Sequence, residues 1–116
     1  MTKELCVVDA CGLINSNGIE LGGRKILAWM YCLFNLIAPG EVSNELCRQR
    51  RTDEARISKQ LVIDHDYSKC LEIAKRWYYK RNLRKEYDML DSGEKHCMAL
   101  ALSLSRNQRR SCSLLT

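Results

Sequence analysis

Short apolar runs alternate with longer amphipathic stretches along this chain. Residues 5–8 form an apolar run that ends at Asp9, and residues 34–38 form a second run that stops before Pro39. Two further runs cover residues 60–64 and 111–115. Consecutive apolar positions predict strands that are buried on both faces, as in a parallel sheet. We therefore predict four strands over these ranges.

Helical periodicity occupies most of the sequence between these runs. It predicts helices over residues 24–33, 41–50, 67–85 and 92–106, and a short helix or a loop over residues 51–58. Asn17-Gly18 and Gly22-Gly23 predict turns. Strands that alternate with helices imply right-handed crossovers and a parallel sheet with helices on both faces. The predicted fold is thus α/β, a three-layer α/β/α sandwich with a central, mainly parallel sheet in one domain over residues 1–116.

Positive charge is concentrated in one of the predicted helices. The chain carries a net charge of +5, and residues 69–85 hold seven Lys and Arg residues with a single acid, Glu72. Such a stripe can supply sequence-independent affinity for phosphate, although a solvated helix face explains it equally well. The candidate nucleic-acid contacts are Lys75, Arg76, Lys80, Arg81 and Tyr79. Trp77 continues the apolar stripe of Cys70, Ile73 and Ala74, so it is predicted to face the core.

The cysteines and the apolar runs indicate the cellular compartment in which the protein is expected. The chain has seven cysteines, an odd number, and none of them forms a CxxC pair. Reduced thiols in apolar surroundings, and hence a cytoplasmic protein, fit this pattern better than a disulfide framework. The N-terminal residues do not read as a signal peptide, and the apolar stretch 26–38 is too short to cross a bilayer. We expect no membrane contact.

Three acids stand where chemistry is expected in an α/β fold. Asp9 ends the first predicted strand, Glu45 lies on the helix after the second, and Glu94 lies in the first turn of the last helix. Carboxylates that converge at the carboxyl edge of a parallel sheet suit Mg²⁺ or Mn²⁺. Each acid also has a purely structural explanation. Asp9 can cap the next segment, Glu45 can pair with Arg48, and Asp91 with Glu94 matches a capping box.

Four segments, in this order, resemble the PIN-domain family of metal-dependent nucleases: VVDACGLIN (7–15), LIAPGEVSNEL (36–46), LDSGEKHCMALALSLS (90–105) and CSLLT (112–116). The resemblance implies an endoribonuclease that hydrolyses single-stranded RNA with Mg²⁺ or Mn²⁺. By position, Asp9 would be the principal metal ligand, Glu94 a second ligand, and Glu45 would orient the attacking water. Cys11 stands where the family often has a small polar residue. Proteins of this kind include toxins of toxin–antitoxin pairs and often dimerise, so an antitoxin protein and a second copy are the implied partners.

The resemblance also implies a weakened site. In the family, a residue like Thr116 is commonly followed by a fourth acid, and then by a final strand and helix. The sequence stops at Thr116, so we expect three of the four acids and reduced turnover. Two alternatives stay open. One is a non-catalytic module on the same fold that binds RNA or a protein partner. The other is a different small α/β domain, receiver-like or flavodoxin-like.

Overall fold

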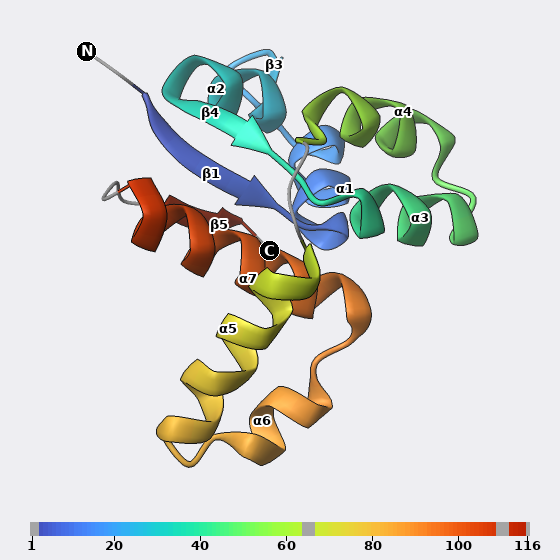
Figure 1. Cartoon of the computed structure of the whole chain (residues 1–116). Coiled ribbons are helices and arrows are strands. Elements are labelled where there is room, and N and C mark those ends of the chain that lie inside the picture. The colour runs from blue at the N-terminus through green and yellow to red at the C-terminus, as the bar shows by residue number, and fades with distance from the viewer. Residues whose placement is uncertain (1–2, 64–66, 109–111, 116) are drawn as a thin grey trace.

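The computed structural model describes residues 3–63, 67–108 and 112–115, with the backbone alone from residue 106 onward. Its elements in chain order are β1 (Glu4–Val8), α1 (Ala10–Gly18), β2 (Glu20–Leu21), β3 (Arg24–Lys25), α2 (Ile26–Leu33), β4 (Phe34–Ile37), α3 (Gly40–Arg48), α4 (Thr52–Leu61), α5 (Tyr67–Lys80), α6 (Arg84–Met89), α7 (Ser92–Gln108) and β5 (Cys112–Leu115). Figure 1 shows β1 and β4 beside α1 to α4, with α5 and α6 projecting from this body. No helix in the described part of the chain is long and apolar enough to cross a membrane.

A small parallel sheet forms the centre of the fold. Its strand order is β4-β1-β5, and both pairings are parallel. Cys6 of β1 stands opposite Leu36 of β4 in the register, and Val7 stands opposite Ile37. All four of these residues are buried, as the apolar runs predict. The chain is therefore a mixed α/β protein with a parallel sheet, and the layered sandwich stays a prediction.

The predicted strand over residues 60–64 is wrong. Helix α4 continues to Leu61, so Gln60 and Leu61 are helical. Only Val62 pairs with the sheet, through one parallel bridge to Ala38, while Asp64 lies outside the described residues. The polar stretch before it, left open as helix or loop, is the start of α4. A short apolar run does not distinguish a strand from a buried helix end, and here the amphipathic pattern of α4 prevails.

The helix predicted over residues 24–33 begins later than predicted. Arg24 and Lys25 pair with Leu21 and Glu20 in a two-stranded hairpin, so α2 begins only at Ile26. The hairpin turns at Gly22 and Gly23, whose φ angles are +63° and +79°. Glycine reaches these angles without steric cost. Asn17-Gly18, in contrast, forms the end of α1.

The long helix predicted over residues 67–85 is broken in two. Helix α5 ends at Lys80, and Asn82 adopts a left-handed backbone with φ of +57°. The backbone N–H of Leu83 then donates to the carbonyl of Tyr78 at 2.9 Å, a closure typical of helix C-termini. Helix α6 leaves in a new direction, so α5 and α6 form a helical hairpin (Figure 1).

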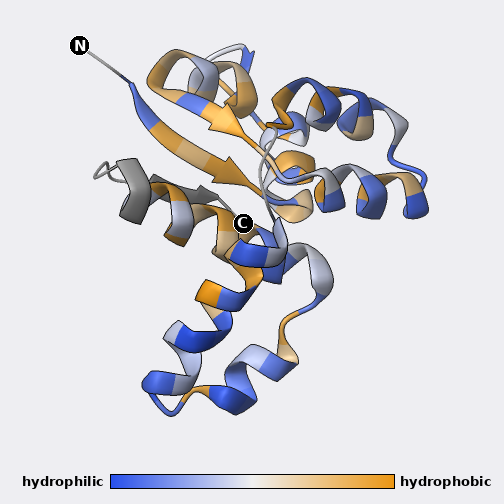
Figure 2. Ribbon diagram, in the orientation of Figure 1, coloured by the Kyte–Doolittle hydropathy of each residue, from blue (hydrophilic) through white to orange (hydrophobic). Residues whose placement is uncertain are grey.

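The hairpin is attached to the body where α5 crosses α7. Ala74 of α5 and Ala99 of α7 are both fully buried there, and Cys70 is buried beside them. Small side chains at a crossing let two helix backbones approach closely. Figure 2 shows the hydrophobic residues concentrated in β1, β4 and α2, whereas α5 and α6 consist largely of hydrophilic residues. The hairpin therefore contributes little to the hydrophobic core beyond its crossing with α7.

Candidate functional site

Asp9 lies directly after β1, at the carboxyl end of the central strand. It is the N-cap of α1, and its Oδ1 accepts the backbone N–H of Gly12 at 2.8 Å. The side chain is only 8% exposed. Burial raises the pKa of Asp9, the charge of Asp91 raises it further, and the hydrogen bond from Gly12 opposes both. The capping role and the position at the sheet edge thus coexist in one residue.

Glu45 reaches toward the start of α7 from helix α3. A methyl group built on Gly93 would collide with Glu45 Oε2 and would lie 3.5 Å from Asp91 Oδ1. Burial raises the pKa of Glu45, and the charges of Asp91 and Asp9 raise it further. Glu45 is therefore held among other acids, in a gap that exists only because residue 93 has no side chain.

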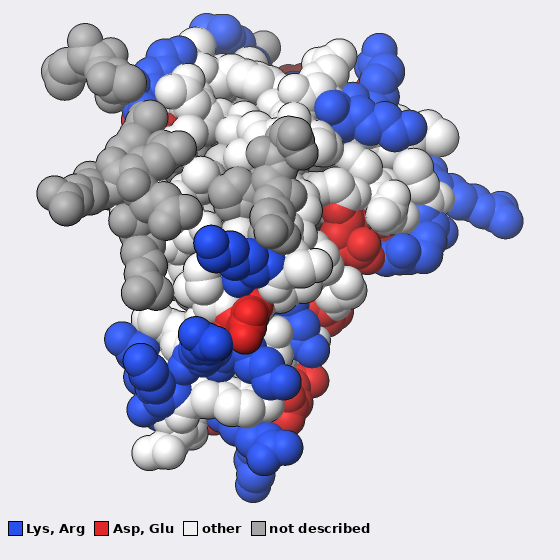
Figure 3. All heavy atoms as spheres, in the orientation of Figure 1, with Lys and Arg blue, Asp and Glu red and all other residues white. Residues whose placement is uncertain are grey.

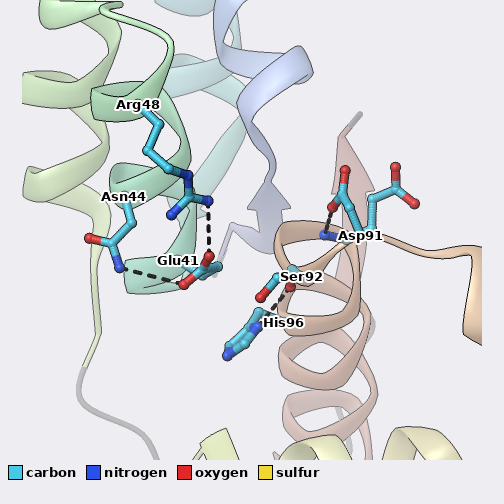
Figure 4. A network of polar contacts seen from close by, with 7 residues as sticks. Glu41, Asn44, Arg48, Asp91, Ser92 and His96 are labelled. Carbon is cyan, nitrogen blue, oxygen red and sulfur yellow. Dashed lines mark hydrogen bonds and ion pairs between the residues drawn. The ribbon is translucent and has the colours of Figure 1, made fainter.

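The surface ion pair considered for Glu45 belongs to a different residue. Arg48 Nη2 lies 3.2 Å from Glu41 Oε1, and Figure 4 shows the Arg48 side chain turned toward Glu41. Asn44 also donates to Glu41, at 3.5 Å. Arg48 lowers the pKa of Glu45 only as a smaller, opposing influence. Arg48 therefore pairs with Glu41, and the charges of Asp91 and Asp9 have a larger effect on Glu45 than Arg48 has.

Glu94 and Asp91 meet at the first turn of α7. The Oδ1 atom of Asp91 accepts the backbone N–H of Glu94 at 2.8 Å (Figure 4). The Asp91 backbone also contacts the Glu94 carboxylate and lowers its pKa, as the predicted capping box requires. Burial and the charges of Asp91 and Asp9 outweigh this effect, so the pKa of Glu94 is raised. Capping explains why both residues are here, but it does not explain why Glu94 shares a pocket lining with Asp9.

Sequence reasoning missed Asp91 as a member of this group. It assigned Asp91 only a capping role, yet the charge of Asp91 raises the pKa of Asp9, Glu45 and Glu94 alike. The signal was present, because an N-cap lies close to the N3 carboxylate of its own capping box. The structure therefore brings four carboxylates together, three of which the sequence identified.

A pocket of about 420 Å³ opens beside the acids. Its lining residues are Asp9, Cys11, Tyr78, Leu90, Glu94, Cys97 and Met98. Cys11 is exposed and Cys97 is buried, and both are free thiols. Burial, reinforced by the surrounding acids, raises the pKa of both thiols. Sequence reasoning also missed Tyr78, since it selected Tyr79 as the exposed ring.

The donor chemistry of the acids fits a hard divalent cation. Carboxylate oxygens are the ligands that Mg²⁺ and Mn²⁺ prefer, and the absent side chain at Gly93 leaves room for Glu45 beside Asp91. Among the described residues, however, no group of three or more His, Cys, Asp or Glu side chains is already arranged to hold a metal ion.

The predicted nucleic-acid contacts lie on α5 and in the turn after it. Lys75, Arg76, Lys80 and Arg81 are all exposed, and Tyr79 is 37% exposed. Figure 3 shows Lys and Arg side chains gathered around the lower part of the molecule, where α5 and α6 project. None of these five residues lines the pocket beside the acids, which we call the acidic pocket. Helix α5 contributes Tyr78 to its lining.

No family model, no curated protein and no solved structure matches this chain. The resemblance to PIN domains therefore depends only on the four sequence segments.

Proposed function

We propose that this chain is a PIN-like endoribonuclease that uses Mg²⁺ or Mn²⁺ to hydrolyse phosphodiester bonds of single-stranded RNA. One observation carries the proposal. Asp9 and Glu94 line one pocket at the carboxyl end of β1, and Glu45 reaches the adjoining residue Gly93 from α3. The charge of Asp91 raises the pKa of all three acids. Partly buried carboxylates that raise one another's pKa oppose folding, and such arrangements are typical of functional sites. A divalent cation would relieve the repulsion.

The chain's own residues divide the work as follows. Asp9, fixed by the Gly12 N–H, and Glu94, fixed at the start of α7, hold the cation. Glu45, held in the gap at Gly93, orients the attacking water. When bound, the cation supplies Lewis-acid polarisation of the phosphoryl oxygen.

Water is the nucleophile in this proposal, because the two cysteines of the pocket are unsuited to the task. Cys11 and Cys97 have raised pKa values, so both stay protonated at neutral pH. A protonated thiol is a poor nucleophile.

For the fold, the proposal is a three-layer sandwich of the PIN type. The parallel strand order β4-β1-β5 supports it.

Cleavage of labelled single-stranded RNA tests this function. The assay compares Mg²⁺, Mn²⁺ and EDTA, with the wild-type chain beside Asp9→Asn. Asparagine is a good N-cap of nearly the same volume, so the variant removes the charge and keeps the cap. We expect cation-dependent cleavage that falls by about 100-fold or more in Asp9→Asn. Asp53→Asn, an exposed site on α4, is the matched control and should cleave normally. Cleavage in EDTA, or full activity in Asp9→Asn, would contradict the proposal.

A second candidate function is a non-catalytic module that binds RNA or a protein partner. It is favoured by the lack of a ready-made metal group in the described residues. Salt-sensitive RNA binding, without cleavage in either cation, would identify this function instead.

A further inference from the structure

A second and larger hollow borders the crossing of α5 and α7. Its volume is about 600 Å³, and we call it the basic groove. Its lining residues are Ile73, Arg76, Trp77, Lys80 and Arg81 from α5 and the turn after it, and Leu102 and Ser105 from α7. Met98 of the acidic pocket and Leu102 of the basic groove are one turn apart on α7, about 6 Å along its axis. The two hollows are therefore neighbours.

The basic groove combines positive charge with an apolar floor. Arg76, Lys80 and Arg81 are exposed, whereas Ile73 and Leu102 are half-buried. Ile73, Arg76, Trp77 and Lys80 are spaced at i, i+3, i+4 and i+7 on α5, so they share one helix face, and Arg81 follows in the turn. A single-stranded polynucleotide needs this combination, because its phosphates require cations and its unpaired bases require flat apolar surfaces.

Trp77 and Arg81 are already stacked. The Arg81 guanidinium lies 4.0 Å from the centre of the Trp77 ring, and its Nη1 donates to the Trp77 carbonyl at 3.2 Å. Trp77 was predicted to face the core, but it is half-buried and lines the groove. A planar cation held by both contacts loses little further freedom when a base stacks on it. A freely solvated arginine would not be ordered in this way.

A smaller hollow of about 360 Å³ extends the basic groove around α5. Arg76 and Lys80 line it together with Lys75, Tyr79 and Glu72, the ion-pair partner of Arg76. The Lys75 ammonium lies 5.4 Å from the centre of the Tyr79 ring. Cations and an aromatic ring therefore continue around the outer face of α5.

Three tyrosines pack together between this hollow and the acidic pocket. The ring of Tyr79 contacts that of Tyr87 at 6.3 Å between centroids, and Tyr87 contacts Tyr78 at 5.5 Å. Tyr78 in turn lines the acidic pocket. Tyr87 is buried, so it supports the two neighbouring rings from beneath, while Tyr79 and the half-buried Tyr78 border the way around α5 to the acids.

We infer that the basic groove binds single-stranded RNA next to the acidic pocket, with Arg76 and Lys80 on phosphates and the Trp77–Arg81 stack beneath a base. The bound strand continues around α5, past Tyr79, toward the acids. This inference rests on the proposed function in one respect, namely that the bound strand is the RNA to be cleaved. A duplex is excluded because its bases are stacked on one another and cannot reach the Trp77–Arg81 pair.

Fluorescence anisotropy of a short, labelled poly-uridine RNA tests the groove. The measurement is made on the full chain in EDTA, so that binding is recorded without cleavage. We expect Arg76→Gln combined with Lys80→Gln to weaken binding at least about five-fold. The dependence of log K on log salt should become shallower by about 1.4, since each phosphate contact of a single strand contributes about 0.7. Arg81→Lys keeps the charge but loses the planar stack, and it should also weaken binding about five-fold.

The matched control is Arg56→Gln combined with Lys59→Gln on α4. Arg56 is exposed and pairs with Asp53 at 2.6 Å, as Arg76 pairs with Glu72 at 3.0 Å, so both double variants lose two charges and one ion pair. The control should bind RNA like the wild-type chain. Equal weakening in both double variants, or unchanged binding in both, would overturn the inference. Equal competition by duplex RNA or by poly-glutamate would also overturn it, the latter in favour of an acidic protein partner.

This test is separate from the test of the proposed function. Unchanged RNA binding in Arg76→Gln combined with Lys80→Gln, together with cation-dependent cleavage by the wild-type chain, contradicts only the groove. Groove binding without any cleavage contradicts only the nuclease.

Discussion

The carboxylate of Glu45 lies against the backbone of Gly93, in space that any other residue at position 93 would fill. Gly93 is buried in the first turn of α7, and its φ angle is not of the kind that requires glycine. Its role is therefore spatial and not conformational. It allows a side chain of α3 to stand beside Asp91 of the α7 cap.

Gly93→Ala should consequently reduce RNA cleavage sharply while leaving the helix intact. Alanine favours helix formation, but its methyl group would push the Glu45 carboxylate away from Asp91. We expect RNA cleavage to fall about 100-fold, the cost of misplacing a catalytic group by about 1 Å. The same substitution in a Glu45→Gln background should add little. Gly18→Ala is the control, since a methyl group there meets nothing within 4 Å. Full activity in Gly93→Ala would show that the position of Glu45 is unimportant.

Asp9→Asn should stabilise the protein at neutral pH. The pKa of Asp9 is raised in the folded state, mainly by burial, so its ionised form opposes folding. The penalty appears as the pH rises from 3.8, the unperturbed value, through the higher folded value. The melting temperature of Asp9→Asn should therefore exceed that of the wild-type chain by about 2–4 °C at pH 7. The difference should disappear below pH 3.8, where both side chains are neutral.

Thermal melts across this pH range provide the measurement. Asp53→Asn is the useful contrast, because hydrogen bonds from Asn17 and Arg56 lower the pKa of Asp53. Its substitution should leave the melting temperature unchanged or reduce it at neutral pH. A lower melting temperature for Asp9→Asn would contradict this prediction, and it would mean that the negative charge of Asp9 at the N-terminus of α1 stabilises the fold despite its burial.

Asp91 should contribute to cation binding beyond its capping role. Asp91→Asn keeps a good N-cap but removes the charge that Asp9, Glu45 and Glu94 all sense. We expect Mg²⁺ to raise the melting temperature of the wild-type chain, since it binds only the folded acids. In Asp91→Asn the binding should be about ten-fold weaker. An equal Mg²⁺ response in both chains would limit Asp91 to capping α7.

The sequence predicted best where burial and local chemistry act together. The apolar runs 5–8 and 34–38 are strands because consecutive apolar side chains must be covered on both faces. The start of α7 was predictable from the capping box of Asp91 and Glu94. Helix α3 begins after Pro39, as expected from the fixed backbone of proline. These features depend on neighbours within a few positions.

Predictions failed where two conformations compete locally. The apolar pattern of residues 67–85 supports one helix throughout, and it gives no weight to the left-handed Asn82 that ends α5. Residues 60–64 could equally end a helix or form a strand. Trp77 fits the buried stripe, yet α7 leaves its ring at the edge of a groove. Which option prevails depends on packing against distant segments.

By itself, the sequence determined that the protein has a parallel α/β core and that Asp9, Glu45 and Glu94 are its candidate acids, since strand burial and helix capping are local properties. Only the tertiary structure decided that Asp91 joins them, that Gly93 makes room for Glu45, and that Tyr78 and Trp77 line different hollows. The physical reason is that these relationships depend on how α3, α5 and α7 pack together. Helix packing is set by side chains far apart in the chain, and no pattern along the sequence records it.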